Sequence, residues 1–369
     1  MTIALPHTIF LTFNSLQLLK SFRYLLLPLS FLYAIILRVR NWLFDKNILK
    51  SFPFNFPIIC VGNLAVGGTG KTPMVEYLLR MLKDQYAVAT ISRGYKRKTK
   101  GFGIANKNTT ALDIGDEPMQ FHLKFPDVTV AVGEARLEAI PQLLHEKPAT
   151  SLIILDDAFQ HRQVKAGLNI VLTEYKNLYS RDFLLPSGDL RDNTSSARRA
   201  EVIIVTKCRH SISEQEKKLL IKELQPTVTQ HVFFTEILYT QPYHLFTKKE
   251  FVITENTEVL LVCGIANPKP LKDYLTAQVN SYDMLKYPDH HIFDSDDLAE
   301  IKKHFSKLAA QNKIILTTEK DGVRLKKFEK ELIDLPLYVL PIQHSFMFNE
   351  AEKFSDLVNN FILSFKKEN

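Results

Sequence analysis

A glycine-rich segment near residue 65 has the residue types and spacing that could bind a phosphate chain. The apolar run PIICV at 57–61 leads into it, and Gly70, Lys71 and Thr72 close it where a helical pattern begins. Glycines let successive backbone N–H groups point at phosphate oxygens, and a helix N-terminus adds positive potential. In such a loop the lysine reaches the β- and γ-phosphates and the threonine hydroxyl ligates Mg²⁺. The pattern predicts a nucleoside triphosphate site formed by Ala65, Val66, Gly67, Gly68, Thr69, Gly70, Lys71 and Thr72.

The loop departs from the strict form of this motif at one position. GxxxxGK[ST] has glycine where this chain has Ala65, although Gly67 and Gly68 supply flexibility inside the loop. The alternative is an ordinary glycine-rich turn between a strand and a helix. Such a turn needs glycine but has no use for Lys71 and Thr72, so a phosphate-binding loop explains more of the sequence.

Two adjacent carboxylates follow a later apolar run. The run at 152–155 precedes Asp156 and Asp157, which places both acids at the carboxyl end of a buried strand, where ligands of open α/β sheets bind. Mg²⁺ prefers carboxylate and water oxygens beside nucleotide phosphates. A helix N-cap is the alternative for such a pair. With the loop present, we expect at least one of the two to serve the metal, and the sequence leaves open which one.

Two further segments could handle the proton of an acceptor alcohol. Asp116 stands in GDEP, and His290 stands in YPDHHIF beside Asp289 and His291. Phosphoryl transfer to an alcohol needs a base or positioning group near the acceptor, and a carboxylate hydrogen-bonded to a histidine is one such arrangement. Each signal is weak alone, because GDEP is commonly a turn and paired histidines on a loop are more often solvated.

Short apolar runs that alternate with helical patterns would position these groups. Between the first two runs, apolar residues at 3.6-residue spacing in 72–84 predict a crossover helix. The pattern predicts an α/β fold, with a mostly parallel sheet of the P-loop NTPase kind and helices on both faces. The predicted buried strands lie at 57–61, 87–91, 128–132, 152–155, 168–173 and 202–206.

The alternation pauses in the aromatic segment 231–246 and then resumes. A second, smaller α/β unit after a linker is the simplest explanation. The sequence predicts four parts: an N-terminal apolar segment at 1–50, a nucleotide-binding domain at 51–230, a linker at 231–250 and a C-terminal α/β domain at 251–369. Asp116 and His290 would then belong to different domains, which would have to close on each other to assemble one site.

The N-terminal segment suggests contact with a membrane. The stretch Tyr24 to Leu37 carries no charge, and the basic residues Lys20, Arg23, Arg38 and Arg40 flank it. Fourteen helical residues span roughly 21 Å, less than the ~30 Å hydrocarbon core, so an interfacial or shallowly inserted helix is favoured over a clean span. The flanking cations could meet anionic headgroups. The alternative is a helix buried against the rest of the protein.

Composition is that of an ordinary globular chain. Of its 369 residues, 46% are hydrophobic and 24% are charged, which excludes disordered, collagen-like and coiled-coil proteins. The net charge of +7 suits phosphate-rich ligands or an anionic membrane and does not require nucleic acid. The three cysteines are widely spaced, which favours neither a disulfide framework nor a zinc site. No protein partner is evident.

A set of motifs resembles the tetraacyldisaccharide 4′-kinase family, the lipid A 4′-kinases of Gram-negative bacteria. The motifs occur in the family's order from about residue 22 to residue 325, and VGNLxxGGxGKTP, DDxFQH and PDHH are unusual outside it. The matching stretches are RNWLFD, VGNLAVGGTGKTP, SRGYKRK, GDEP, DDAFQHR, LLPSGDLR, VIIVTK, GIANP, PDHHIF and TTEKDGVRL.

The resemblance implies a kinase at the cytoplasmic face of the inner membrane, bound peripherally or monotopically. It would use ATP and Mg²⁺ to phosphorylate the 4′-hydroxyl of a lipid disaccharide, tetraacyldisaccharide 1-phosphate, and so form lipid IVA. It also implies roles for particular residues. Gly67 to Thr72 would cradle ATP, and Asp156, Asp157 and Glu117 would serve the metal. Asp116 would be the base, supported by His290. Arg93 and Arg191 would contact phosphate or sugar, unless they form ion pairs.

The sequence departs from the family pattern at three places. Ala158 replaces the usual glycine of DDGFQH, where we expect only a small backbone adjustment. Asp192 replaces the usual glutamate of LLPSGxLRE, which shortens the reach of that carboxylate. Roughly the first 20 residues form an extension on which the resemblance says nothing.

Two other classes of protein share these features. One is a membrane-associated regulatory P-loop NTPase, which hydrolyses its nucleotide to switch a partner. The other is a membrane-docking scaffold whose loop binds nucleotide only structurally. The fate of the terminal phosphate separates them, because a kinase transfers it to the disaccharide and a switch releases it to water.

Overall fold

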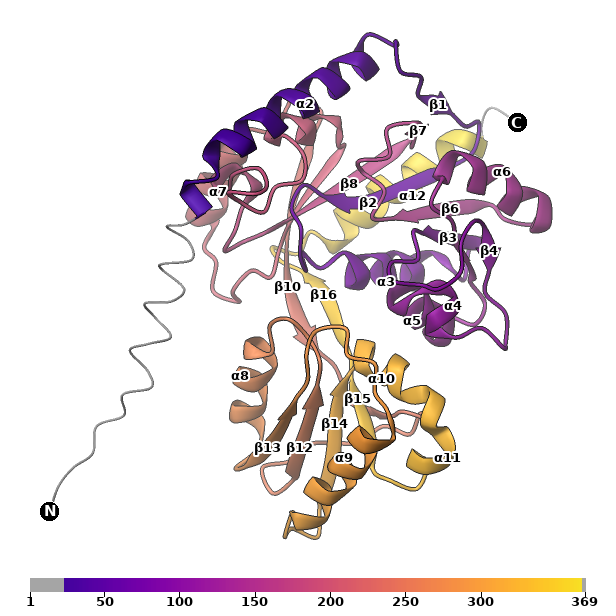
Figure 1. The fold of residues 1–369 in the computed structure, drawn as a ribbon. Coiled ribbons are helices and arrows are strands. Elements are labelled where there is room, and N and C mark those ends of the chain that lie inside the picture. Colours follow the sequence, from indigo (N-terminus) through magenta and orange to yellow (C-terminus); the bar gives the residue numbers. More distant parts are fainter. Residues whose placement is uncertain (1–22, 367–369) are drawn as a thin grey trace, which may run out of the picture. The chain divides into compact units, whose positions relative to one another are not determined.

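Parallel strands with intervening helices make up most of the computed structural model, which describes residues 23–366 (Figure 1). Two compact units divide the chain. The first contains the residues up to Val75, Ser151–Glu236 and the residues from Ser345 onward, and the second contains Glu76–Thr150 and Ile237–His344. Neither unit is a single continuous stretch of chain, so residues distant in sequence come together within each.

The first unit is built on parallel strands that are buried along nearly their whole length. Continuous apolar runs suit such strands, because helices cover both faces of a parallel sheet. Parallel pairs join β2 to β6 and β8, β8 to β9, and β9 to β10. The strand order is β16-β10-β9-β8-β2-β6, with bounds β2 (Ile58–Asn63), β6 (Leu152–Asp156), β8 (Leu168–Glu174), β9 (Val202–Thr206), β10 (His231–Tyr239) and β16 (Ile342–Phe346).

Helices and two short strands complete the first unit. Ser213 caps the N-terminus of α7 by accepting a hydrogen bond from the backbone N–H of Glu216. Phe354 of α12 packs against Phe233 of β10, with ring centroids 5.4 Å apart. The elements are α2 (Leu27–Asp45), the start of α3 (Lys71–Leu82), α7 (Glu214–Leu224), α12 (Ala351–Lys366), the 3₁₀ turns η1 (Tyr179–Arg181) and η2 (Thr194–Arg199), and the strand pair β1 (Phe52–Pro53) and β7 (Val164–Lys165).

The second unit holds a short strand group and a five-stranded sheet. The short group has the order β3-β5-β4 and is accompanied by α4 (Ala111–Ile114), α5 (Asp116–Lys124) and α6 (Arg136–Glu146). The larger sheet has the order β11-β15-β14-β12-β13, and β11 is its antiparallel edge. The strand bounds are β3 (Val88–Ser92), β4 (Gly103–Ile104), β5 (Thr129–Val132), β11 (Tyr243–His244), β12 (Glu258–Cys263), β13 (Tyr282–Lys286), β14 (Lys313–Thr318) and β15 (Leu337–Leu340).

Alternate residues of the five-stranded sheet face two separate cores. Leu260 and Val262 of β12 pack with Phe293 on one face, whereas Val259 and Leu261 pack with Leu275 on the other. Helices therefore cover both faces (Figure 1). Helix α8 (Lys269–Gln278) covers one, and α9 (Ser295–Lys307), α10 (Glu319–Leu325), η3 (Lys326–Phe328) and α11 (Glu329–Leu332) cover the other.

The predicted α/β fold is confirmed, and each predicted strand lies within two residues of an observed one. The segment 231–250 differs from a simple linker, because β10 and β11 lie within it. Its aromatic and β-branched residues interrupt the helix–strand alternation yet have high strand propensity. Helix α12 belongs to the first unit and not to a C-terminal domain, because its aromatic face packs on β10. The four domain boundaries stay a prediction.

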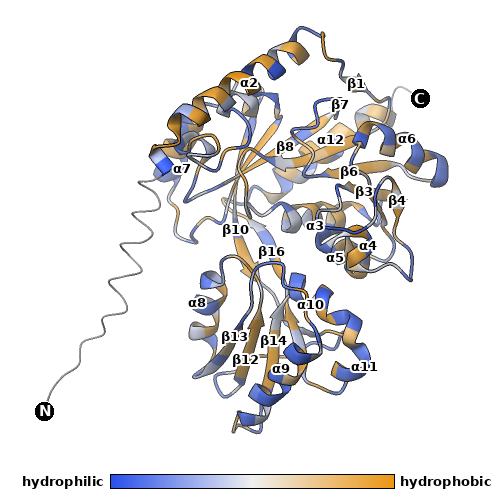
Figure 2. Cartoon of the chain, viewed as in Figure 1, coloured by the Kyte–Doolittle hydropathy of each residue, from blue (hydrophilic) through white to orange (hydrophobic). Residues whose placement is uncertain are grey.

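Helix α2 presents a mostly exposed apolar surface (Figure 2). Ser30, Leu37 and Phe44 are its buried residues, and 17% of its most apolar window is buried. By length and composition the helix could cross a membrane. The core helix of a soluble protein can have the same length and composition, but it would be mostly buried. The alternative of a helix buried against the protein is therefore disfavoured.

Polar residues in α2 and just before it form hydrogen bonds with loops of the same unit. Tyr33 donates to the carbonyl of Arg191 at 3.1 Å. Arg23 donates to the Gly188 carbonyl and to Asp189, and Arg40 donates to the Gln160 carbonyl. These two arginines, expected to meet lipid headgroups, thus have protein partners. Arg38 is exposed, and Lys20 lies outside the described residues, as does the extension before it.

Candidate active site

The glycine-rich loop follows β2 and leads directly into α3, as the sequence predicts. Gly67 and Gly70 have φ of +103° and +90°, a region that L side chains rarely adopt. The backbone N–H of Val66 donates to the Asp189 carbonyl at 2.7 Å, and Thr206 Oγ1 donates to the Thr69 carbonyl at 2.8 Å. The strand, the glycines and these neighbouring segments therefore hold the loop in its conformation.

Lys71 lies within a polar cluster at the base of this loop. Its Nζ atom is 3.2 Å from Oδ1 of Asn63 and 3.7 Å from Oδ1 of Asp157. Asn63 in turn donates to Thr69 Oγ1 at 2.9 Å, and Arg191 donates to both Asn63 and Asp157. Two cations thus share one carboxylate, which places excess positive charge where a phosphate chain would lie.

Asp156 and Asp157 stand at the carboxyl end of β6, as expected. Asp156 is buried and is the last residue of the strand, whereas the side chain of Asp157 is 36% exposed. Asp157 has a positive φ of 50°, and Ala158 does not have a positive φ. The family's glycine is therefore not needed for a left-handed backbone at 158, and the expectation of a small adjustment stays a prediction.

The donor set of this loop suits Mg²⁺. Across residues 23–366 there is no group of three or more His, Cys, Asp or Glu side chains that could hold a metal ion by itself. Carboxylate and hydroxyl oxygens are nevertheless the ligands that Mg²⁺ takes beside nucleotide phosphates, while water and phosphate oxygens complete its shell. Thr72 in the first turn of α3, with Asp156 and Asp157 after β6, supplies such oxygens.

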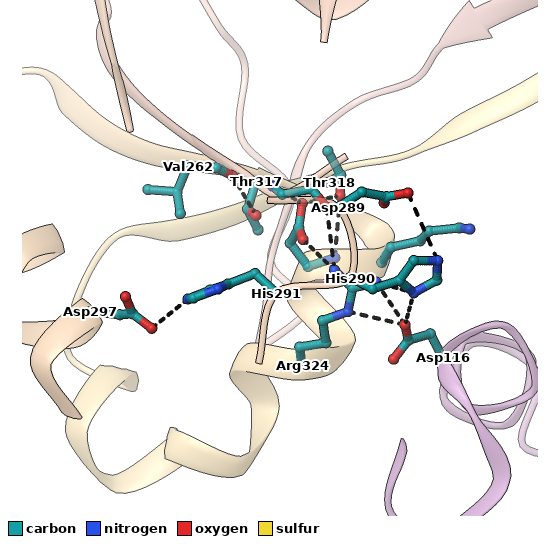
Figure 3. A network of polar contacts seen from close by, with 12 residues as sticks. Asp116, Val262, Asp289, His290, His291, Asp297, Thr317, Thr318 and Arg324 are labelled. Carbon is teal, nitrogen blue, oxygen red and sulfur yellow. Dashed lines mark hydrogen bonds and ion pairs between the residues drawn. The ribbon is translucent and has the colours of Figure 1, made fainter. Parts of the chain in front are cut away.

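The second unit brings Asp116 and His290 together (Figure 3). Nδ1 of His290 lies 3.1 Å from Oδ2 of Asp116. Asp116 begins α5, and His290, in a left-handed conformation with φ of 62°, lies in the loop between β13 and α9. Both residues belong to the same compact unit, so the expectation that they lie on two different bodies is corrected. The reason is that 76–150 and 237–344 together make up one compact unit.

Arg324 of α10 is the third member of this group. Its Nη2 and Nε atoms donate to Oδ2 of Asp116 at 2.6 and 3.1 Å. Its Nη1 atom donates to the fully buried Asp321 at 3.0 Å. Burial acts to raise the pKa of Asp116, but the hydrogen bonds and charge of Arg324, with those of His290, outweigh it and lower the pKa. The Asp116 carboxylate is thus held ionised.

Glu117 and Lys320 form a neighbouring pair. Lys320 Nζ donates to Oε1 of Glu117 at 2.6 Å. Burial acts to raise the pKa of Glu117, and the charge and hydrogen bond of Lys320 more than offset it, so the pKa is lowered. Glu117 is therefore ionised as a metal ligand must be, but its present partner is a lysine and not a further oxygen ligand.

The sequence also singles out Arg93, Arg191 and Asp192. Arg93 is exposed, and Arg191 forms an ion pair with Asp157. Asp192 is fully buried and accepts from Ser196 Oγ at 2.9 Å, while Arg199 lies 3.1 Å away. The shorter side chain at 192 is thus enclosed by its own partners.

Sequence reasoning assigned no role to Asn63, Asp321 or Arg324. The motifs that contain them were recognised, since Asn63 lies in VGNLAVGG and the other two lie in TTEKDGVRL. The available signal was the i, i+3 spacing of Asp321 and Arg324, which places them on one side of a helix. Nothing in that spacing indicates that Arg324 would meet Asp116.

Comparison with known proteins shows the family to which this chain belongs. A family model described as tetraacyldisaccharide-1-P 4′-kinase matches residues 22–362. The chain belongs to this kinase family. A tetraacyldisaccharide 4′-kinase of Flavobacterium johnsoniae is 45% identical over 348 residues, which cover 94% of this chain and 98% of that protein. One of Parabacteroides distasonis is 45% identical over 350 residues, covering 91% and 94% of the two chains.

A solved structure of the same kinase family is similar over most of the chain. The crystal structure of LpxK from Aquifex aeolicus in complex with ATP superposes with a TM-score of 0.73 at 30% sequence identity. The match covers 92% of this chain and 99% of that protein. The kinase fold therefore extends over both compact units and not only over the glycine-rich loop.

Proposed function

We propose that this protein is an ATP-dependent lipid kinase that transfers the γ-phosphoryl group of ATP to the 4′-hydroxyl of tetraacyldisaccharide 1-phosphate, giving lipid IVA. Membership of the tetraacyldisaccharide-1-P 4′-kinase family supports the reaction and its acceptor. The ATP complex of the Aquifex aeolicus relative supports the donor. Adenine and not guanine is inferred from that likeness alone.

Residues of the first unit bind the donor. The backbone amides of the loop up to Gly70 cradle the phosphates, and Lys71 offsets charge on the β- and γ-phosphates. Thr72, Asp156 and Asp157, with Glu117 as a further ligand, would hold Mg²⁺, which would neutralise the charge that develops on the phosphoryl oxygens. If Asp157 turns toward the metal, the N–H groups of Arg191 that contact Asp157 become available to donate to the phosphoryl oxygens.

Residues of the second unit act on the acceptor. The 4′-oxygen of the sugar attacks the γ-phosphorus, and the bond between that phosphorus and the β–γ bridging oxygen breaks, so ADP leaves. Asp116 accepts the hydroxyl proton as the bond forms, and His290 supports it through the hydrogen bond to Oδ2.

We propose that α2 docks the enzyme on the cytoplasmic face of the bacterial inner membrane, peripherally or monotopically. The acyl chains of the substrate lie in the bilayer while ATP is in water, so the reaction takes place at the interface. The exposed apolar side of α2 supports this role. Burying an apolar side chain in the acyl region contributes about 1.5–3 kcal/mol, so several such residues suffice for docking.

The contact between Asp116 and His290 carries the proposal, because an acid–base pair of this kind serves an alcohol acceptor. Purified protein is incubated with ATP labelled in the γ-phosphate, with and without the lipid disaccharide, and the products are separated. The kinase labels the disaccharide and releases little inorganic phosphate without it. Release of labelled inorganic phosphate regardless of lipid would instead support a regulatory NTPase.

A further inference from the structure

Arg324 is a buried cation that bridges two carboxylates of the second unit. Its side chain is 6% exposed. It contacts Asp116 through Nε and Nη2, and Nη2 also lies 3.1 Å from Nδ1 of His290 (Figure 3). Its Nη1 atom donates to Asp321. A buried guanidinium is expensive to desolvate, so its donors must be satisfied. Hydrogen bonds to both carboxylates satisfy these donors and fix the plane of the guanidinium.

Asp321 anchors this guanidinium to the scaffold. It is fully buried, and its Oδ2 atom accepts hydrogen bonds from the Gly264 N–H at 3.0 Å and from Thr318 Oγ1 at 2.7 Å. Its Oδ1 atom is left for Arg324. Because Gly264 directly follows β12 and Thr318 is the last residue of β14, Arg324 is positioned by the ends of two buried strands and not by a surface loop.

The contacts of Asp116 all converge on one of its two oxygens. Within the described part of the chain, Arg324 and His290 both meet Oδ2, and Oδ1 has no hydrogen-bond partner. The carboxylate cannot rotate without giving up the two hydrogen bonds from Arg324. Oδ1 is therefore the oxygen that stays available to accept a proton.

We propose that Arg324 is a positioning residue for the transfer reaction, which clamps Oδ2 of Asp116 so that Oδ1 is directed at the acceptor hydroxyl. This inference rests on the proposed function, since it requires Asp116 to act on the acceptor. Arg324 itself touches neither substrate in this role. Lysine cannot replace the clamp, because a point charge makes one contact where the planar fork makes two.

Other contacts already hold α10 against α5, so the clamp is not needed merely to join the helices. Lys320 pairs with Glu117, and Lys124 at the end of α5 pairs with the buried Glu319 at the start of α10. Loss of Arg324 therefore leaves two ion pairs between these helices. A substitution at 324 should therefore change the orientation of the Asp116 carboxylate more than the stability of the fold.

A double-mutant cycle tests the clamp. Full-length wild type, Arg324→Gln, Arg324→Lys, Asp116→Asn and the double variant Arg324→Gln/Asp116→Asn are compared for kcat and for the KM of ATP, with thermal unfolding measured alongside. Arg181→Gln is the matched control, because Arg181 makes a similar two-donor pair with Glu223 at 2.6 Å on the exposed surface. We expect that control to keep wild-type kcat.

The inference predicts that Arg324→Gln lowers kcat by about 100-fold, the cost of a reacting group misplaced by roughly 1 Å, with the KM of ATP unchanged. Arg324→Lys retains little more activity. In the Asp116→Asn background the same Arg324→Gln change costs less than about twofold, because Arg324 acts through Asp116.

Five outcomes would count against it. Equal losses in both backgrounds would show that Arg324 acts on the fold or on substrate directly, and a raised KM for ATP with normal kcat would point the same way. Full activity of Arg324→Lys would show that charge alone suffices. Lack of transfer by the wild type, or full activity of Asp116→Asn, would overturn the proposed function or the role of Asp116, and the clamp with it.

Discussion

Nδ1 of His290 lies 3.1 Å from Oδ2 of Asp116, although 174 positions separate the two residues in the sequence. The contact arises because α5 of the N-terminal half of the chain belongs to the same compact unit as the loop after β13. The fold thus brings a carboxylate and an imidazole into contact from two motifs that are weak signals individually.

Removing the carboxylate of Asp116 should impair transfer far more than nucleotide binding. Asp116→Asn keeps the shape of the side chain and lowers kcat by about 10²–10⁴-fold, the usual contribution of a general base. ATP affinity, measured by calorimetry, stays unchanged, because the loop belongs to the other unit. Asp84→Asn, an exposed aspartate paired with Lys83, is the control. Weakened ATP binding with normal turnover would show that the base is elsewhere.

Lys71 should be required for transfer and not for folding. Its Nζ atom pairs with Asn63 and Asp157, and Arg191 holds the same two residues, so Lys71→Ala leaves a largely intact loop. We expect transfer to fall below detection while the circular dichroism spectrum is retained. Lys83→Ala, at the C-terminal side of α3, should behave as wild type. Near-normal transfer by Lys71→Ala would remove the loop from the chemistry.

Both aspartates at the carboxyl end of β6 should affect the Mg²⁺ requirement of the reaction. Asp157 is the more exposed and turns toward Lys71, whereas Asp156 is buried at the end of the strand. If both serve the metal, directly or through water, Asp156→Asn and Asp157→Asn each raise the Mg²⁺ concentration for half-maximal rate by about 10–100-fold. Titration of initial rate with Mg²⁺ measures this. An unchanged titration for one variant identifies it as a structural residue.

Glu319 should make stability fall as pH rises through the weakly acidic range. Burial, and next the neighbouring Glu76, raise its pKa to about 7, while Lys124 opposes them. The folded protein thus holds this proton more tightly than the unfolded chain, where the value is 4.5. The stability contribution is complete below pH 4.5 and is lost between there and about pH 7.

Glu319→Gln removes that titration. Relative to wild type, its free energy of unfolding should gain about 1 kcal/mol for each pH unit across this interval, measured by urea denaturation at several pH values. The exposed Glu146→Gln controls for general charge effects. A difference between Glu319→Gln and wild type that does not vary with pH would contradict the assignment.

Membrane docking should depend on the exposed side of α2. Leu32 and Ile36 are each 55% exposed, so Leu32→Asp and Ile36→Asp should each weaken sedimentation with anionic phospholipid vesicles by about tenfold, the loss of one buried apolar side chain. Leu37→Ala, at a buried position of the same helix, should lower the free energy of unfolding instead. Equal vesicle binding by all three variants would mean that α2 is not the docking element.

Much of the fold could be predicted because its signals are local. The run that becomes β2, the glycines with positive φ and the Lys71–Thr72 pair lie together in the chain, and buried parallel strands are nearly all apolar. Asp156 and Asp157 were placed correctly for the same reason. The extent of α2 was underestimated, because its second half carries arginines whose partners lie in distant loops.

The parts that could not be predicted depend on long-range association. Which segments share a compact unit depends on packing between strands far apart in sequence, so Asp116 and His290 were assigned to different bodies. Arg324 was missed because its partner Asp116 lies 208 positions away. Similarly, the sequence predicts that Arg23 and Arg40 face lipid, because nothing near them in the chain indicates that they donate to backbone carbonyls of their own unit.

The central claim is that the terminal phosphate of ATP ends on a sugar hydroxyl. A single-turnover reaction with the lipid disaccharide tests it most directly, with ADP quantified and the phosphate position on the lipid determined by mass spectrometry and phosphorus NMR. We predict one 4′-phosphate on the lipid for each ADP formed, and none with Lys71→Ala. ADP accompanied by an equal amount of inorganic phosphate, with the lipid unmodified, would contradict the account.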